Sequence, residues 1–126
     1  MKHLFFIIAS FLLLSLTGLT GCEKENKVTL ATVELVSITE RTSNTAKIIT
    51  KVTNEGNGVV TGTGVCWGEF LNPDLSDNVS NVGAGKGTFT SVLTGLKNNT
   101  TYHVRAFATN EKGTVYSNDY SFTTIR

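Results

Sequence analysis

The sequence predicts an all-β sandwich, and three observations support this prediction. From residue 28 onward, no segment places apolar residues at the three- and four-residue spacing of a helix. Short runs of β-branched and aromatic residues recur instead, separated by Gly, Asn and Asp. Charged residues make up only 17% of the 126 residues, below the ~25% of an average soluble protein. Thr and Gly occupy the remaining positions, as is typical of strands and turns.

Six segments are predicted to be strands, and each is bounded by residues that tolerate turn geometry. These segments are 33–39, 45–53, 59–68, 88–93, 102–109 and 115–123. The breaks between them are 41–44, 55–58, 72–87, 97–100 and 110–113. Together they predict one domain of about 95 residues, the size of a seven-stranded immunoglobulin-like sandwich.

The alternation of apolar and polar residues assigns side chains to the two faces of each strand. In segment 102–109, the residues predicted to enter the core are Tyr102, Val104, Ala106 and Ala108. The residues predicted on its outer face are His103, Arg105, Phe107 and Thr109. In segment 45–53, the inward residues are Ala46, Ile48, Val52 and Thr50, and the hydroxyl of Thr50 needs a hydrogen-bond partner there. Trp67 is placed in the core, with Cys66 on the outer face.

The N-terminal residues have the pattern of an export signal. Lys2 and His3 precede the uncharged apolar run 4–16, which is shorter than the ~20 residues of a membrane-spanning helix. A basic start, a short apolar run and an exit of small residues predict a secretory signal peptide. The alternative, a buried N-terminal core helix, lacks the amphipathic pattern that such a helix needs.

The exit from this run is Leu19, Thr20, Gly21 and Cys22, which resembles the lipobox of bacterial lipoproteins. The resemblance implies that the Cys22 thiol receives a diacylglyceryl group and that cleavage makes Cys22 the mature N-terminus. Two or more acyl chains form a stable membrane anchor, whereas a single chain does not. Residues 1–22 are therefore expected to be a lipoprotein signal peptide, and Cys22 the lipidation site.

Residues 23–31 are predicted to be a polar tether between this anchor and a domain that spans 32–126. The run 23–27 resembles the short signal that directs Bacteroidota lipoproteins to the outer surface, and a plain solvated linker is the alternative. The expected location is the cell envelope, at the outer membrane, with surface exposure as the further implication.

The charge balance limits the classes of partner, and the cysteine content limits the possible disulfides. Lys2 is the one charged residue among the first 22, so the remainder has ten basic and ten acidic residues. This balance argues against a nucleic-acid partner. Cys66 is the one cysteine left once Cys22 is modified, so a disulfide within the chain is excluded.

The C-terminal part of the chain carries the clearest family resemblance. Segment 93–113, followed by 121–124, resembles the last third of a fibronectin type III domain. In that family a Leu and a Tyr form a tyrosine corner, in which the Tyr hydroxyl bonds to the backbone. Leu96 and Tyr102 stand at these two positions. The resemblance implies a fibronectin type III fold over residues 32–126.

The upstream part resembles a variety of this family that is common in Bacteroidota surface lipoproteins. The resemblance there rests on segment 64–68 and the loop 72–78 that follows it. One residue departs from the family, because its strand-B Trp is absent and Thr50 or Val52 lies near that position. Trp67 is expected to fill the vacant volume from the next strand.

The sequence contains fragments of catalytic and metal-binding patterns, and none of them is complete. Cys66 and His103 could form a nucleophile–base pair on one sheet face, but no orienting third group is evident. Asp74, Asp77 and Asn78 offer oxygen ligands without the Gly and Glu of a calcium loop. The Gly-rich segment 83–87 lacks the spacing of a phosphate-binding loop. No enzymatic activity, metal or cofactor is therefore predicted.

Binding is the function that these residues favour. Aromatic side chains on a sheet face or loop can stack on sugars or seat a partner protein. The candidates are His103, Arg105, Phe107, Phe70 and Tyr116, with Tyr120 beside them; the alternative is that these side chains only cover sheet edges. The predicted function is a lipid-anchored module for protein interaction or spacing. A glycan-binding lipoprotein of a polysaccharide-uptake system and a subunit of a surface adhesin or fibre are the alternatives.

Overall fold

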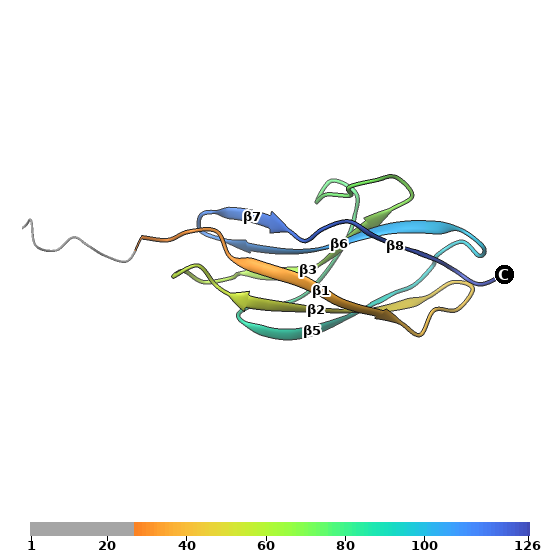
Figure 1. Ribbon diagram of the computed structural model, residues 1–126, viewed down its shortest axis with the longest axis horizontal. Coiled ribbons are helices and arrows are strands. Elements are labelled where there is room, and N and C mark those ends of the chain that lie inside the picture. The colour runs from red at the N-terminus through yellow and green to blue at the C-terminus, as the bar shows by residue number, and fades with distance from the viewer. Residues whose placement is uncertain (1–26) are drawn as a thin grey trace, which may run out of the picture.

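The computed structural model describes residues 27–126, and these residues form eight strands and no helix (Figure 1). The strands are β1 (Thr32–Thr39), β2 (Ala46–Asn54), β3 (Gly62–Gly68), β4 (Asn78–Gly83), β5 (Gly87–Leu93), β6 (Thr101–Asn110), β7 (Gly113–Tyr116) and β8 (Tyr120–Thr123). One antiparallel sheet has the order β1–β2–β5. The other has the order β4–β3–β6–β7, and β8 also pairs with β6. The two sheets face each other, so the predicted β-sandwich is confirmed.

The sequence prediction missed one strand and misplaced the limits of two others. Strand β4 lies inside the predicted break 72–87, and segment 59–68 becomes a strand only at Gly62. The last predicted strand, 115–123, is divided into β7 and β8 at residues 117–119. Strand β4 was missed because it is an edge strand with two Asn residues, which are poor strand formers.

The core lies between the two sheets and is built from the side chains that the alternation assigned to it. Ile48 and Val52 of β2 and Val65 and Val104 of the facing sheet are fully buried. Tyr102, Ala106 and Ala108 belong to the same cluster, and Phe122 stacks on Tyr102 with ring centroids 5.8 Å apart.

Thr50 also faces inward, but its hydroxyl lacks the partner that the sequence analysis expected. Among the described residues, neither Thr50 Oγ1 nor Ser91 Oγ has a hydrogen-bond partner. Thr50 lies on β2, and Ser91 lies on β5 directly opposite Ile48 of β2. The core of the smaller sheet therefore contains two unpaired hydroxyl groups where larger apolar side chains would be favoured.

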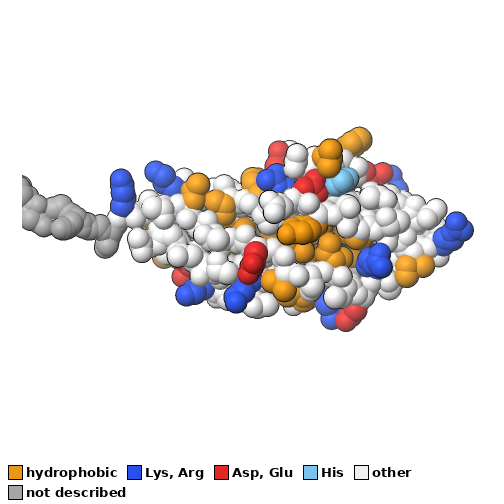
Figure 2. Space-filling model, viewed as in Figure 1, with side chains coloured by type: hydrophobic (Ala, Val, Ile, Leu, Met, Phe, Trp, Pro, Cys, Tyr) orange, Lys and Arg blue, Asp and Glu red, His pale blue; other side chains and the backbone are white. Residues whose placement is uncertain are grey.

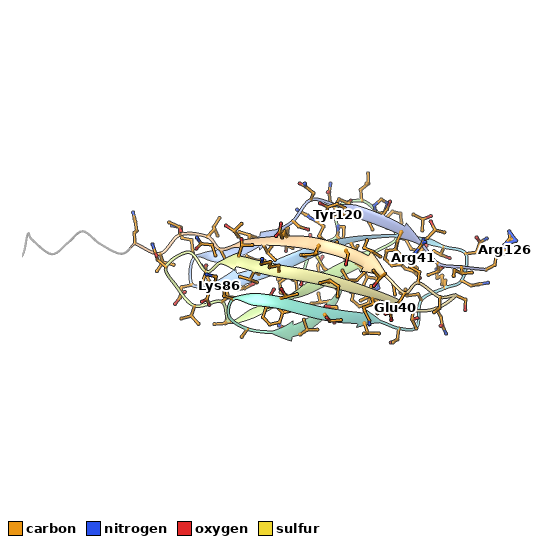
Figure 3. The ribbon with its side chains drawn as sticks, turned by 60° about the horizontal axis from the view of Figure 1, so that its bottom comes forward. Glu40, Arg41, Lys86, Tyr120 and Arg126 are labelled. Carbon is orange, nitrogen blue, oxygen red and sulfur yellow. The ribbon has the colours of Figure 1, made fainter. Side chains whose placement is uncertain are left out.

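The two ends of the sandwich are defined by backbone contacts between distant segments. At one end the amide of Thr29 donates to Gly56 O, and the side-chain amide of Asn110 donates to Thr29 O. At the other end the amide of Leu96 donates to Asn44 O, and that of Ile125 to Thr42 O. The described chain thus begins at the first end and finishes at the second, where Arg126 is labelled in Figure 3.

Residues 1–26 lie outside the described residues, so the predicted signal peptide, Cys22 and most of the predicted tether do as well. The final part of that tether is attached to the domain, because Thr29 is bonded as above and Ala31 is buried. Within residues 27–126, no helix is long and apolar enough to cross a membrane.

Candidate functional site

The outer face of the larger sheet is covered by the loop 69–77, which joins β3 to β4. The carbonyl oxygen of Pro73 accepts hydrogen bonds from Arg105 Nη1 at 3.3 Å and from Cys66 Sγ at 3.5 Å. Pro73 itself is fully buried. The loop therefore lies against side chains of β3 and β6 that the sequence analysis assigned to an open face.

His103 and Tyr116 take part in further contacts that hold the 69–77 loop on the sheet. His103 Nδ1 lies 3.1 Å from Asp119 Oδ1, and the second oxygen of Asp119 accepts the amide of Asn72 at 2.7 Å. The hydroxyl of Tyr116 accepts the amide of Leu75 at 3.3 Å. Asp119 can reach the loop because the last strand is interrupted between β7 and β8.

Arg105 connects the other members of this group. Its guanidinium lies 4.4 Å from the centre of the Tyr116 ring, and its Nε donates to Ser117 O at 3.1 Å. The structure thus brings together four of the five predicted binding residues: His103, Arg105, Phe107 and Tyr116. The polar members hold the loop, so they are largely occupied by contacts within the chain.

Phe107 is the clearest correction to the predicted exposure. It points to the outer face as the alternation requires, yet only 3% of its surface is exposed. It lines a hollow of about 380 Å³ together with Leu75 of the loop and Val79 of β4. Period-two alternation tells which side of a sheet a residue occupies, but it does not tell whether another segment covers that side.

Cys66 is buried by the same loop. Burial raises the pKa of its thiol to about 11, although the nearby charge of Arg105 acts in the opposite direction. In the β3–β6 register Cys66 stands opposite Arg105, whereas His103 stands opposite Gly68. The imidazole of His103 is paired with Asp119, so the structure does not form the Cys66–His103 pair considered from the sequence.

The oxygen atoms of the loop are used in its own turns. Asp74 Oδ1 accepts hydrogen bonds from both the amide and the hydroxyl of Ser76, which lowers the pKa of the Asp74 carboxyl. Asp77 Oδ2 accepts the amide of Asp74. Within residues 27–126 there is no group of three or more His, Cys, Asp or Glu side chains that could hold a metal ion. Segment 83–87 is the connection between β4 and β5.

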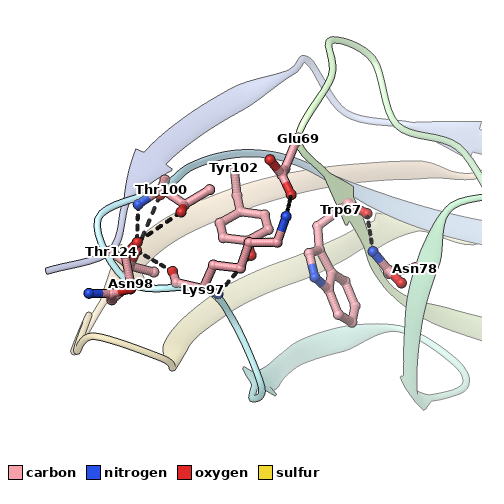
Figure 4. A network of polar contacts seen from close by, with 8 residues as sticks. All are labelled: Trp67, Glu69, Asn78, Lys97, Asn98, Thr100, Tyr102 and Thr124. Carbon is pink, nitrogen blue, oxygen red and sulfur yellow. Dashed lines mark hydrogen bonds and ion pairs between the residues drawn. The ribbon is translucent and has the colours of Figure 1, made fainter. Parts of the chain in front are cut away.

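A second site lies at the end of the sandwich that is remote from Thr29. It is a groove of about 630 Å³ between the end of β3, the start of β4 and the β5–β6 connection. Its polar and aromatic lining is formed mainly by Trp67, Glu69, Asp77, Asn78, Lys97 and Tyr102. Figure 4 shows five residues that line this groove from close by, namely Trp67, Glu69, Asn78, Lys97 and Tyr102, together with three neighbouring residues.

The shape of this groove depends on the tyrosine corner. The hydroxyl of Tyr102 accepts the amide of Lys97 at 2.9 Å, which holds the β5–β6 connection against β6. Leu96, beside Lys97, is buried in the core. The ammonium group of Lys97 then reaches Glu69 Oε2 at 2.7 Å, and this contact raises the pKa of Lys97. Leu96 and Tyr102 therefore position one wall of the groove.

Trp67 was expected in the core, and the structure places it at the boundary between core and groove. It is half-buried and packs against the core cluster, but it also lines the groove. Asn78 Nδ2 donates to its backbone oxygen at 3.2 Å. Sequence reasoning missed this site because its residues come from two separate connections and the strand ends beside them. The signal available was one Trp shortly before a polar loop.

Phe70, the fifth predicted binding residue, lies at the exposed part of the 69–77 loop. Its side chain is 85% exposed and that of Leu71 is 69% exposed. Figure 2 shows hydrophobic side chains projecting beside the one pale-blue histidine, which is His103. Phe70 also lines the rim of the groove.

No family model and no curated protein matches this chain. Among solved structures, it is similar to the sensor domain of the anti-sigma factor RsgI4 from Pseudobacteroides cellulosolvens, with a TM-score of 0.55, 19% identity and coverage of 79% of this chain and 98% of that one. It is also similar to the sixth fibronectin type III domain of human fibronectin type III domain containing protein 3, with a TM-score of 0.54, 22% identity and coverage of 83% and 92%. At these identities the likeness concerns the fold alone. The chain has a fibronectin type III-like β-sandwich fold.

Proposed function

We propose that this protein is a lipid-anchored, non-catalytic binding module of the bacterial cell envelope, held at the outer membrane. The observation that carries the proposal is the position of the groove relative to the start of the described chain. Residues 27–29 lie at the end formed by Gly56 and Asn110, and the groove lies at the opposite end, beside Leu96 and Lys97. A chain anchored through Cys22 would therefore hold the groove away from the bilayer.

The rigidity of the attachment supports the same proposal. Asn110 donates from one side-chain nitrogen to Thr29 O at 2.8 Å and to Glu55 O at 2.9 Å, and its Oδ1 accepts the amide of Lys112. This buried amide joins the entering segment to two turns. The domain would then project from a short link, with its groove and the exposed Phe70–Leu71 pair available to an envelope partner.

The anchor is tested by metabolic labelling with radioactive palmitate in a Gram-negative host that expresses the full chain. We expect label in the wild-type protein and none in Cys22→Ala, because the acyl chains need the Cys22 thiol. Cys66→Ala is the matched control, since it removes the other cysteine, which is buried under the 69–77 loop. Equal labelling of wild type and Cys22→Ala would show that the lipid anchor is not at Cys22.

A further inference from the structure

The groove that contains Trp67 combines an aromatic ring with polar groups that retain hydrogen-bonding capacity. The indole nitrogen of Trp67 makes no hydrogen bond to any other residue drawn in Figure 4. The edge of the indole ring that carries this nitrogen faces Lys97 and Tyr102. Asn78 uses its nitrogen on the Trp67 backbone, which leaves its side-chain oxygen as an acceptor. The groove thus offers an apolar ring, a donor and an acceptor within one hollow.

An ion pair forms part of the same wall. Lys97 and Glu69 are 2.7 Å apart and both are substantially exposed. Each retains further hydrogen-bonding capacity, because an ammonium group has three donors and a carboxylate has about four acceptor positions. Asp77 lines the groove as well, so its charged groups are one cation and two anions. This balance disfavours an anionic ligand such as a phosphate or an acidic polysaccharide.

We propose that this groove binds neutral glycans, with a sugar ring against the indole of Trp67 and its hydroxyl groups bonded to Asn78, Lys97 and Glu69. A pyranose has an apolar face and a rim of hydroxyls that both donate and accept, which matches an aromatic ring surrounded by mixed donors and acceptors. The volume of about 630 Å³ lies within the ~300–1,000 Å³ that is typical of small-ligand sites. The open form of the groove allows a longer chain to continue beyond it. This inference deepens the proposed binding function and rests on it.

The test uses the intrinsic fluorescence of Trp67, which is the one tryptophan of the chain. The full-length protein in detergent micelles is titrated with hexasaccharides of β-glucan, xylan, α-mannan and arabinan, and with hexagalacturonate as the acidic probe. We expect at least one neutral hexasaccharide to shift the emission saturably, with no response to hexagalacturonate. Titration calorimetry then measures the affinity of the responding sugar for each variant, because Trp67→Phe lacks the tryptophan that gives the fluorescence signal.

Two substitutions at the groove and one elsewhere complete the experiment. Trp67→Phe and Lys97→Ala should each weaken binding about tenfold, the loss that corresponds to one aromatic or charge-assisted contact. Lys97 is exposed, so its substitution leaves the fold intact. Tyr120→Ala is the control, because Tyr120 is an exposed aromatic that lines a different hollow beside β1 (Figure 3).

Each outcome separates this proposal from the anchoring proposal, which palmitate labelling tests independently. No response to any neutral sugar at millimolar concentration would overturn glycan binding and leave the anchored module unaffected. Binding that survives both groove substitutions would also overturn it, since the sugar would then bind elsewhere. A preference for hexagalacturonate would show that the charge argument is wrong.

Discussion

The outer face of the larger sheet and the groove at the end of the sandwich contain similar residue types in different situations. On the outer face, Arg105 and Tyr116 bind to the 69–77 loop, and Phe107 is buried in a hollow that Leu75 of this loop also lines. In the groove, the ammonium group of Lys97 is paired with an exposed carboxylate, and Trp67 is half-buried, so both side chains remain accessible. The difference teaches that a cluster of aromatic and basic residues on a strand can be structural, whereas a groove between connections can supply the binding surface.

The largest expected effect concerns the two phenylalanines of this comparison. Phe107→Ala should lower the free energy of unfolding by about 3 kcal/mol, since it removes a large buried side chain. Phe70→Ala should change it by less than about 0.5 kcal/mol, because Phe70 is 85% exposed. Urea denaturation followed by circular dichroism measures both values. Similar stabilities for the two variants would contradict the burial of Phe107.

An intermediate effect is expected for the two cations. Arg105→Ala should cost about 1–2 kcal/mol, because it removes two hydrogen bonds to backbone oxygens and the contact with the Tyr116 ring. Lys97→Ala should leave the free energy of unfolding nearly unchanged, since its ion pair is exposed. Limited proteolysis adds a second measurement, in which only the Arg105 variant should be cut faster in the 69–77 loop.

The smallest effect is a dependence of stability on alkaline pH. Burial raises the pKa of the Cys66 thiol to about 11 from 9.0 in an open environment, so the folded state retains this proton longer than the unfolded state. The contribution to stability is complete below pH 9 and is lost as pH rises toward 11. Between pH 8.5 and 10 the wild type should lose about 1 kcal/mol more than Cys66→Ala. The comparison with Cys66→Ala removes the effect of other groups that titrate in this range, and parallel curves would show that the thiol is not buried.

The sequence predicted features that depend on neighbouring residues better than features that depend on contacts between distant segments. The alternation in β6 correctly assigned Val104, Ala106 and Ala108 to the core and His103 and Arg105 to the opposite side. Strand β4 was not recognised, because Asn, Ser and Gly occupy four of its six positions and its two Val residues, three positions apart, show no period-two alternation. Gly64 is a related case: a side chain there would collide with Ser80 O, a close approach between β3 and β4 that the sequence does not reveal.

The candidate sites were harder to predict than the strands. The five proposed binding residues were chosen as exposed side chains on one face or loop, and the structure leaves Phe70 as the one that is fully exposed. The groove was not foreseen, since Trp67 and Lys97 are thirty residues apart in sequence and meet only when the β5–β6 connection folds toward β3.

The sequence by itself determined the all-β class, the direction of most side chains and the Tyr102 position of the corner, because these depend on period-two patterning and short-range turn chemistry. The tertiary structure alone decided that the 69–77 loop covers Cys66, that Phe107 is buried on the outer face, and that Trp67, Lys97 and Glu69 line one groove. Contacts of this second kind join segments far apart in the chain. Their geometry is set by how the two sheets pack and by where the connections cross their ends, which no local pattern records.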